Sequence, residues 1–84
     1  MNLTSAAIQI LPMNADNSEV IRIVDEAIAF IKSFGLHTVV GPFETTVEGD
    51  YDTIMKIVSE VTRISLGAGA EEIMTYVKIC AKND

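Results

Sequence analysis

The sequence predicts an α+β domain with its elements in the order strand, helix, strand, strand, helix, strand. Two segments alternate apolar and polar residues as strands do, and two others repeat apolar residues at helical spacing. A Gly-Pro turn separates two short segments that also read as strands. In chain order the segments are 4–11, 18–34, 36–40, 44–48, 51–66 and 72–80. The 84 residues are enough for one domain, which we assign to 1–84.

The first strand segment has two unlike faces. Alternation places Ile8 and Ile10 on one face and Gln9 on the other. Pro12 is expected to end the strand, because proline has no N–H to donate to a sheet. A loop rich in Asn and Asp is then expected over 13–17.

The first helix carries signals at both ends. Asp16, Asn17 or Ser18 can act as the N-cap, because each has a short side chain with an oxygen acceptor. Gly35 follows the helix and suits a left-handed C-cap.

The third strand segment puts Thr45 on one face and Thr46 and Glu48 on the other. Gly49 is expected to break this strand. Asp50 is expected to cap the second helix.

This order contains two strand–helix–strand units joined by a hairpin. Right-handed crossovers place both helices on one face of a four-stranded antiparallel sheet, which is the ferredoxin-like arrangement. The other face stays open, and such a face usually marks an interface or a ligand site. It is expected to carry Ala7, Leu11, Met74 and Tyr76 beside Gln9, Thr46, Glu48 and Lys78.

The composition favours some classes of binding partner over others. Hydrophobic residues make up 49% of the chain and the mean hydropathy is +0.32. A domain this small gains from burying more apolar area, so we expect a homo-oligomer, either a dimer or a tetramer. The net charge of −6 argues against nucleic acid, whose binding needs a basic surface. It suits a cationic or neutral small molecule.

Location follows from what the sequence lacks. No apolar run approaches the roughly 20 residues that span a bilayer, so no membrane partner is expected. The start of the chain does not resemble a signal peptide. The single cysteine, Cys80, excludes an internal disulfide. Together these observations predict a cytoplasmic protein.

Catalysis and cofactors are not expected. His37 is the only histidine and no cysteine pattern accompanies it, so no metal site is predicted. No nucleophile–base pair is evident. An acylphosphatase would use an arginine in a phosphate-binding loop, whereas Arg22 and Arg63 both fall in expected helices. The sequence therefore predicts neither catalytic residues nor a cofactor.

The segment 41–50 is the most unusual part of the chain. Two threonines and a glutamate stand at a strand end, between glycines that allow close backbone approach. Hydroxyl and carboxylate groups of this kind can hold a nitrogen heterocycle. The same residues also suit a solvated hairpin followed by a helix cap. From the residues alone both readings stay open.

The chain resembles the small thiamine-binding proteins of the YkoF and YqgV type. The resemblance runs over 7–12, 30–36, 41–50, 67–71 and 77–79. Its sharpest part is Gly-Pro at 41–42 followed by Thr-Thr-Val-Glu-Gly-Asp at 45–50. The resemblance implies a ferredoxin-like, oligomeric protein that binds thiamine or its hydroxymethylpyrimidine part without catalysis.

By this resemblance Thr45, Thr46 and Glu48 are expected to contact the ligand, with Glu48 accepting from the pyrimidine. We add Gln9, from the open face, and Phe43, whose ring could stack on a flat heterocycle. The expected function is a homo-oligomeric carrier or sensor of thiamine or its pyrimidine precursor. The alternative is a structural or regulatory homo-oligomer without a small ligand.

Overall fold

The order of the elements is the predicted one. The computed structural model describes residues 3–83. Its elements are β1 (Leu3–Met13), α1 (Asn17–Lys32), β2 (His37–Val40), β3 (Thr45–Asp50), α2 (Tyr51–Gly67) and β4 (Glu72–Ala81). The ends of these elements differ from the sequence prediction by at most two residues, which is the usual uncertainty of element ends.

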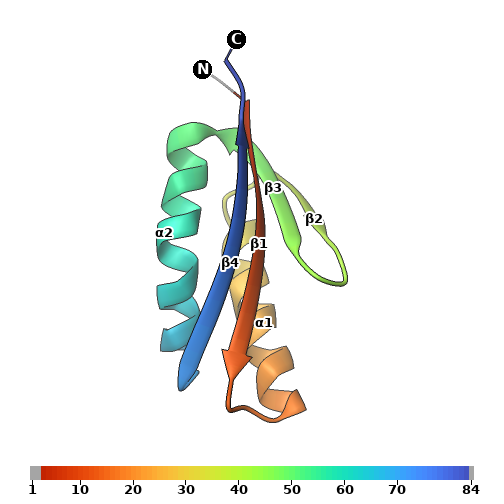
Figure 1. Ribbon diagram of the computed structural model, residues 1–84, viewed down its shortest axis with the longest axis vertical. Helices are drawn as coiled ribbons and strands as arrows, with labels where there is room; N and C mark the ends of the chain where they lie inside the picture. Colours follow the sequence, from red (N-terminus) through yellow and green to blue (C-terminus); the bar gives the residue numbers. More distant parts are fainter. Residues whose placement is uncertain (1–2, 84) are drawn as a thin grey trace.

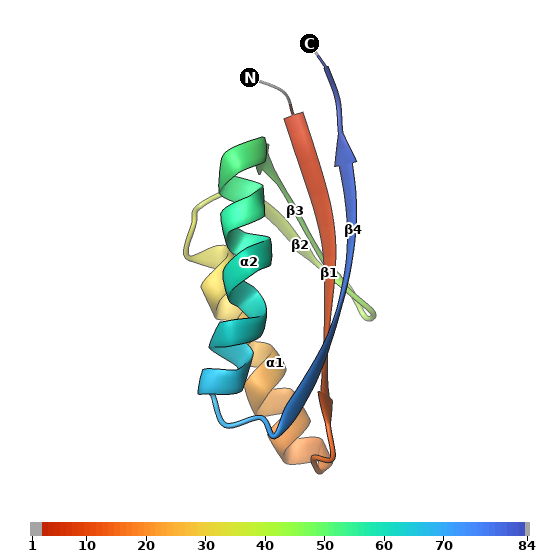
Figure 2. The same cartoon turned by 60° about the vertical axis from the view of Figure 1, so that its left-hand side comes forward.

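The four strands form one antiparallel sheet in the order β2-β3-β1-β4. Both helices cover the same face, and the other face is open (Figures 1 and 2). This confirms the ferredoxin-like arrangement. The first and last strands lie side by side at the centre and one edge, so the two ends of the described chain meet at one end of the sheet (Figure 1).

The core lies between the sheet and the helices. Alternation along β1 sends Ala6, Ile8 and Ile10 toward the helices, as predicted. They pack with apolar residues of both helices and of β3, and burial of this kind is the main stabilising term in folding. The remaining core residues are Ala27, Ile31, Val47, Ile54, Ile57 and Val61.

Both helices begin at an aspartate. The Asp16 carboxylate accepts a hydrogen bond from the Glu19 N–H at 3.0 Å. The Asp50 carboxylate accepts from the Thr53 N–H at 3.1 Å. These bonds satisfy N–H groups that have no partner inside the helix. After α1, Gly35 has a φ of 69°, the left-handed conformation expected there.

The prediction that Pro12 ends the first strand is wrong, because β1 continues to Met13. The Leu3 C=O accepts from the Lys82 N–H at 3.1 Å on the β4 side. Since backbone groups alternate sides along a strand, even-numbered residues of β1 point theirs toward β3. The β1–β3 register ends at Ile8 opposite Thr45. Pro12 therefore stands where no N–H is required, as on an edge strand.

The prediction that Gly49 breaks the third strand is also wrong. β3 begins at Thr45 and runs on through Gly49, which pairs with Thr4. A Cβ on Gly49 would lie 2.8 Å from Cδ1 of Leu36. The glycine therefore makes room for a neighbouring side chain, and the strand continues to the Asp50 cap.

Candidate functional site

The link between β2 and β3 is a tight turn over residues 41–44, which we call the hairpin tip. The Gly41 N–H donates to the Glu44 C=O at 2.9 Å and closes the turn. Phe43 stands at its apex with 80% of its surface exposed. An exposed aromatic ring on a closed turn is available for contact with a flat ligand.

The second half of β1 has a strand partner on one side. Beyond Ile8, the register within residues 3–83 pairs β1 with β4 alone. The β2–β3 hairpin diverges from β1 toward its tip (Figure 1). By the alternation of backbone groups, Ile10 turns its N–H and C=O toward the side that β3 has left. This edge carries hydrogen-bonding capacity that no strand uses.

The space left by β3 is a cleft of about 190 Å³, which we call the inner cleft. Its walls are the hairpin tip, the second half of β1 and one side of α1. For comparison, a cavity of about 150 Å³ is enough to bind benzene, so the inner cleft has room for one substituted ring. Its lining residues are Ile8, Gln9, Ile10, Leu11, Val24, Ala27, Ile28, Ile31, Gly41, Pro42, Phe43, Glu44 and Thr45.

A second cleft, the outer cleft, lies on the open face beside the hairpin tip. Its volume is about 490 Å³, within the range of small-molecule sites. Across it Lys78 Nζ lies 3.3 Å from a carboxylate oxygen of Glu44. The lysine is 77% exposed, so the ion pair is screened by water and easily exchanged for another partner. The lining residues are Val39, Gly41, Pro42, Phe43, Glu44, Thr46 and Lys78.

The predicted site residues divide between these clefts. Gln9 and Thr45 line the inner cleft, and Thr46 lines the outer one. Phe43 lines both. Thr45 is nearly buried, with 6% of its surface exposed, because alternation turns it toward the helices and away from Thr46.

Glu48 lines neither cleft. It lies on the open face two residues beyond Thr46, and it is half-buried. The register places it between His37 on β2 and Ser5 on β1. It therefore shares the face of Thr46 but stands outside the lining of both clefts.

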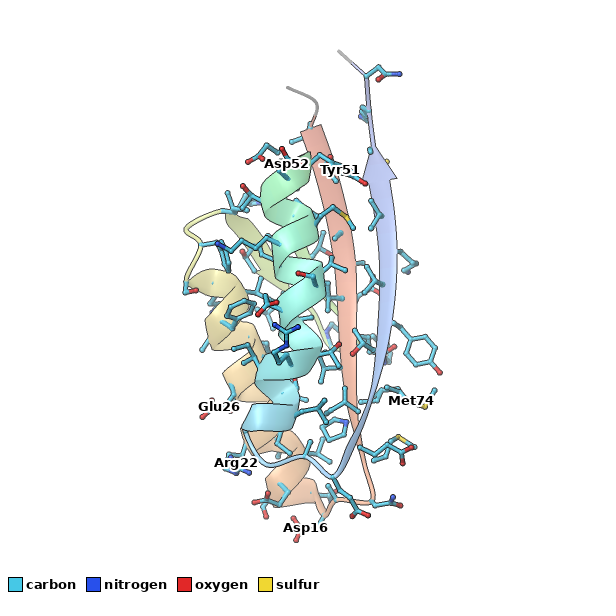
Figure 3. The ribbon with its side chains drawn as sticks, turned by 90° about the vertical axis from the view of Figure 1, so that its left-hand side faces the viewer. Asp16, Arg22, Glu26, Tyr51, Asp52 and Met74 are labelled. Atoms are coloured by element: carbon cyan, nitrogen blue, oxygen red, sulfur yellow. The ribbon has the colours of Figure 1, made fainter. Side chains whose placement is uncertain are left out.

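The open face also carries exposed apolar side chains. Val39, Met74 and Tyr76 are each 43% exposed or more. Figure 3 shows Met74 projecting from β4 on the side away from the helices. Tyr76 lies on this face as the sequence predicts, and Tyr51, at the start of α2, is also exposed, by 42%.

Other candidate groups stand apart from the clefts. Cys80 is a free and exposed thiol, and His37 is exposed at the edge of the sheet. Across residues 3–83, no three His, Cys, Asp or Glu side chains are placed to hold a metal ion. No helix in the described range is both long and apolar enough to cross a membrane.

Sequence reasoning missed the inner cleft and its wall on α1. The helical spacing in 18–34 predicts a buried stripe that includes Val24, whereas Val24 and its neighbour Ile28 line the inner cleft beside β1. A signal was present: segment 4–11 is longer than its partner segment 44–48. A strand that outruns its neighbour must leave an unpaired edge.

Comparison with protein families gives a match over most of the chain. The sequence profile described as "Thiamine-binding protein" matches residues 6–84. A UPF0045 protein of Clostridium perfringens is 37% identical over 79 residues, which cover 94% of this chain and 82% of the relative.

Comparison with solved structures also gives matches over most of the chain. A protein of Streptococcus pneumoniae is 30% identical, with a TM-score of 0.87 over 99% of this chain and 89% of its own. A protein of Thermotoga maritima, described as a candidate thiamine biosynthesis or salvage protein, is also 30% identical. Its TM-score is 0.82, over 92% of this chain and 81% of its own.

Proposed function

Because this chain belongs to the thiamine-binding protein family, we propose that it binds thiamine or the hydroxymethylpyrimidine part of thiamine. In this proposal the protein holds its ligand without transforming it, as a homo-oligomeric carrier or sensor in the cytoplasm. The description of the Thermotoga maritima structure as a candidate thiamine biosynthesis or salvage protein supports the choice of ligand.

The observation that carries the proposal is the pair of clefts around the hairpin tip. Four of the five residues named from the sequence line one or both of them: Gln9, Phe43, Thr45 and Thr46. The inner cleft has room for one ring, and the outer cleft falls in the size range of small-molecule sites. Together they suit a ligand made of two small rings.

The charges near the hairpin tip favour the same ligand. Thiamine carries a positive charge on its thiazolium ring. The chain has a net charge of −6, and the carboxylates of Glu44 and Glu48 both lie on the open face. Lys78 opposes them, but it is paired with Glu44 and exposed. An acidic surface of this kind attracts a small cation.

We propose that a second copy of the chain packs against the open face. Leu11, Met74 and Tyr76 contribute apolar surface there, two of them with more than 40% exposure. Packing two sheets face to face would remove this surface from water. Sedimentation at micromolar concentration should therefore show a dimer or tetramer, and a 9.1 kDa monomer as the sole species would contradict it.

The same exposed surface supports the alternative function, an oligomer that holds no small ligand. Titration calorimetry with thiamine and with hydroxymethylpyrimidine separates the two. Binding by an oligomeric parent protein supports the proposal. If neither compound binds at millimolar concentration, the ligand-free alternative becomes the better account.

A variant tests the part of Glu48. A hydrogen bond to a charged group contributes about 1.5–3 kcal/mol, so Glu48→Gln should weaken thiamine binding about ten- to a hundredfold. Asp50→Asn is the matched control, since it removes a carboxylate nearby at a helix cap, where asparagine caps equally well. Thermal melts check that both variants fold. Parent-like affinity in Glu48→Gln would show that Glu48 is not a ligand contact.

A further inference from the structure

The end of β1 presents a specific pattern of backbone groups to the inner cleft. The Leu3–Lys82 hydrogen bond fixes which residues of β1 face β4, and Ile10 and Pro12 face the other way. Ile10 offers one N–H donor and one C=O acceptor. Pro12 offers a second C=O but no N–H, because proline has none. The edge therefore has one donor and two acceptors.

We propose that this backbone edge recognises the ligand's ring. The pattern fits a planar nitrogen heterocycle in which a ring nitrogen stands next to an amino group. The Ile10 N–H donates to the ring nitrogen, and the C=O of Ile10 or Pro12 accepts from the amino group. This inference rests on the proposed function and deepens it, since an aminopyrimidine has this edge and a thiazolium does not.

The walls of the inner cleft fit the faces of such a ring. Val24 and Ile28 of α1 supply apolar contacts at one side, and Phe43 stands at the hairpin tip. The volume of about 190 Å³ admits one substituted ring and leaves no room for two. A charged ring placed among these aliphatic side chains would also lose its hydration, and the one carboxylate in the lining, Glu44, is already paired with Lys78. The neutral ring is therefore the part that enters.

The cleft passes through the plane of the sheet. Residues from both faces of β1 line it, Ile8 and Ile10 from the helix face and Gln9 and Leu11 from the open face. A substituent on the bound ring can therefore extend to the open face. There the carboxylates of Glu44 and Glu48 are available to a cation, which gives the two parts of thiamine different surroundings.

Ligand analogues and amide NMR test the hydrogen-bond pattern. Hydroxymethylpyrimidine is titrated into ¹⁵N-labelled parent protein, and the Ile10 amide signal should shift on binding. Two analogues each remove half of the pattern: one lacks the amino group, and one has CH in place of the neighbouring ring nitrogen. Each should bind about tenfold more weakly, as expected for one lost hydrogen bond.

A filled-cleft variant tests the location. Val24→Phe adds a ring at the wall of the inner cleft and should weaken binding of hydroxymethylpyrimidine at least tenfold. Ile21→Phe is the matched control on the same helix, at a position 62% exposed, and should bind like the parent. Thermal melts confirm folding. The NMR titration of the parent needs neither variant, so misfolding of Val24→Phe leaves the test intact.

The outcomes separate the inference from the proposed function. If thiamine binds but shifts only amides of the outer cleft, such as Val39 and Thr46, and both analogues bind like hydroxymethylpyrimidine, the inference is overturned and the function stands. If neither thiamine nor hydroxymethylpyrimidine binds at millimolar concentration, both are overturned. A shifted Ile10 amide together with two weakened analogues supports both.

Discussion

The two halves of β1 belong to one continuous strand but have different surroundings. Residues 3–8 are paired with β3 on one side and β4 on the other, whereas residues 9–13 are paired with β4 alone. In both halves the even-numbered residues up to Ile10 are buried and the odd-numbered ones are more exposed. The difference comes from the shorter neighbouring strand, so unused hydrogen-bonding capacity in a sheet depends on the partner strand as much as on the strand itself.

Truncating a side chain of β1 should have the largest effect on the free energy of unfolding. Ile8→Ala, at a core position 2% exposed, is expected to cost about 2–5 kcal/mol of unfolding free energy, because it leaves a cavity. Leu11→Ala, half-buried in the other half, should cost about 1 kcal/mol or less. Denaturant unfolding measures both. Equal losses would show that the open face at Leu11 is packed as tightly as the helix-covered face at Ile8.

Hydrogen exchange should sharpen the contrast at the level of single amides. Ile8 lies opposite Thr45 within the β1–β3 ladder, whereas Ile10 faces the inner cleft. We expect the Ile10 amide to exchange about a hundredfold faster than that of Ile8, because its exchange needs no opening of the ladder. If hydroxymethylpyrimidine binds as proposed, it should slow the exchange of the Ile10 amide and leave that of the Ile8 amide unchanged. Similar protection of both amides in the free protein would contradict the geometry.

A smaller effect is expected at Thr4 in the doubly paired half. Its side chain is fully buried, and its hydroxyl has no hydrogen-bond partner among residues 3–83. Thr4→Val should stabilise the protein by about 1 kcal/mol, since it removes an unsatisfied buried polar group. Thr4→Ala should not, because it also leaves a void. A destabilised Thr4→Val would mean that the hydroxyl is satisfied in solution.

The smallest effects concern the helix caps at opposite ends of the sheet. The Glu19 N–H lowers the pKa of Asp16, and the Thr53 hydroxyl and N–H lower the pKa of Asp50. Their contribution to stability is therefore present above the ordinary pKa of 3.8 and is lost as the pH falls through the lowered value. Figure 3 shows Asp16 at the start of α1.

The matching variants are Asp16→Asn and Asp50→Asn. Each should melt close to the parent at neutral pH, because asparagine also caps helices. Each should lose less stability than the parent as the pH falls below the ordinary pKa of 3.8. Thermal melts across that range provide the measurement. A variant that follows the parent's acid profile would show that its carboxylate does not contribute.

The fold was predictable because the local signals agreed. The alternation of β1 and β4, the helical stripes and the caps at Asp16 and Asp50 all pointed to one arrangement. The two errors, at Pro12 and Gly49, share a cause. Both residues were read as strand breakers, yet one faces a vacated edge and the other accommodates Leu36. These are tertiary facts that a residue's own preference does not contain.

The site was predictable only in part. The segment 41–50 did identify the hairpin tip, and three of its four expected contacts, Phe43, Thr45 and Thr46, line a cleft. Adjacent residues in a strand face opposite ways, so Thr45 and Thr46 belong to different surfaces. The backbone groups of Ile10 and Pro12 could not be found by searching for functional side chains. They depend on where β3 stops pairing.

The hydrogen bond between Leu3 and Lys82 has an engineering consequence. It holds the two ends of the described chain together at the end of the sheet away from the hairpin tip (Figure 1). A short peptide joining the ends would close the chain into a ring without bending the sheet. Such a ring has fewer unfolded conformations, and its folded form should resist heat better than the linear chain. New ends could then be opened elsewhere on the surface, which would make the protein a circularly permutable scaffold.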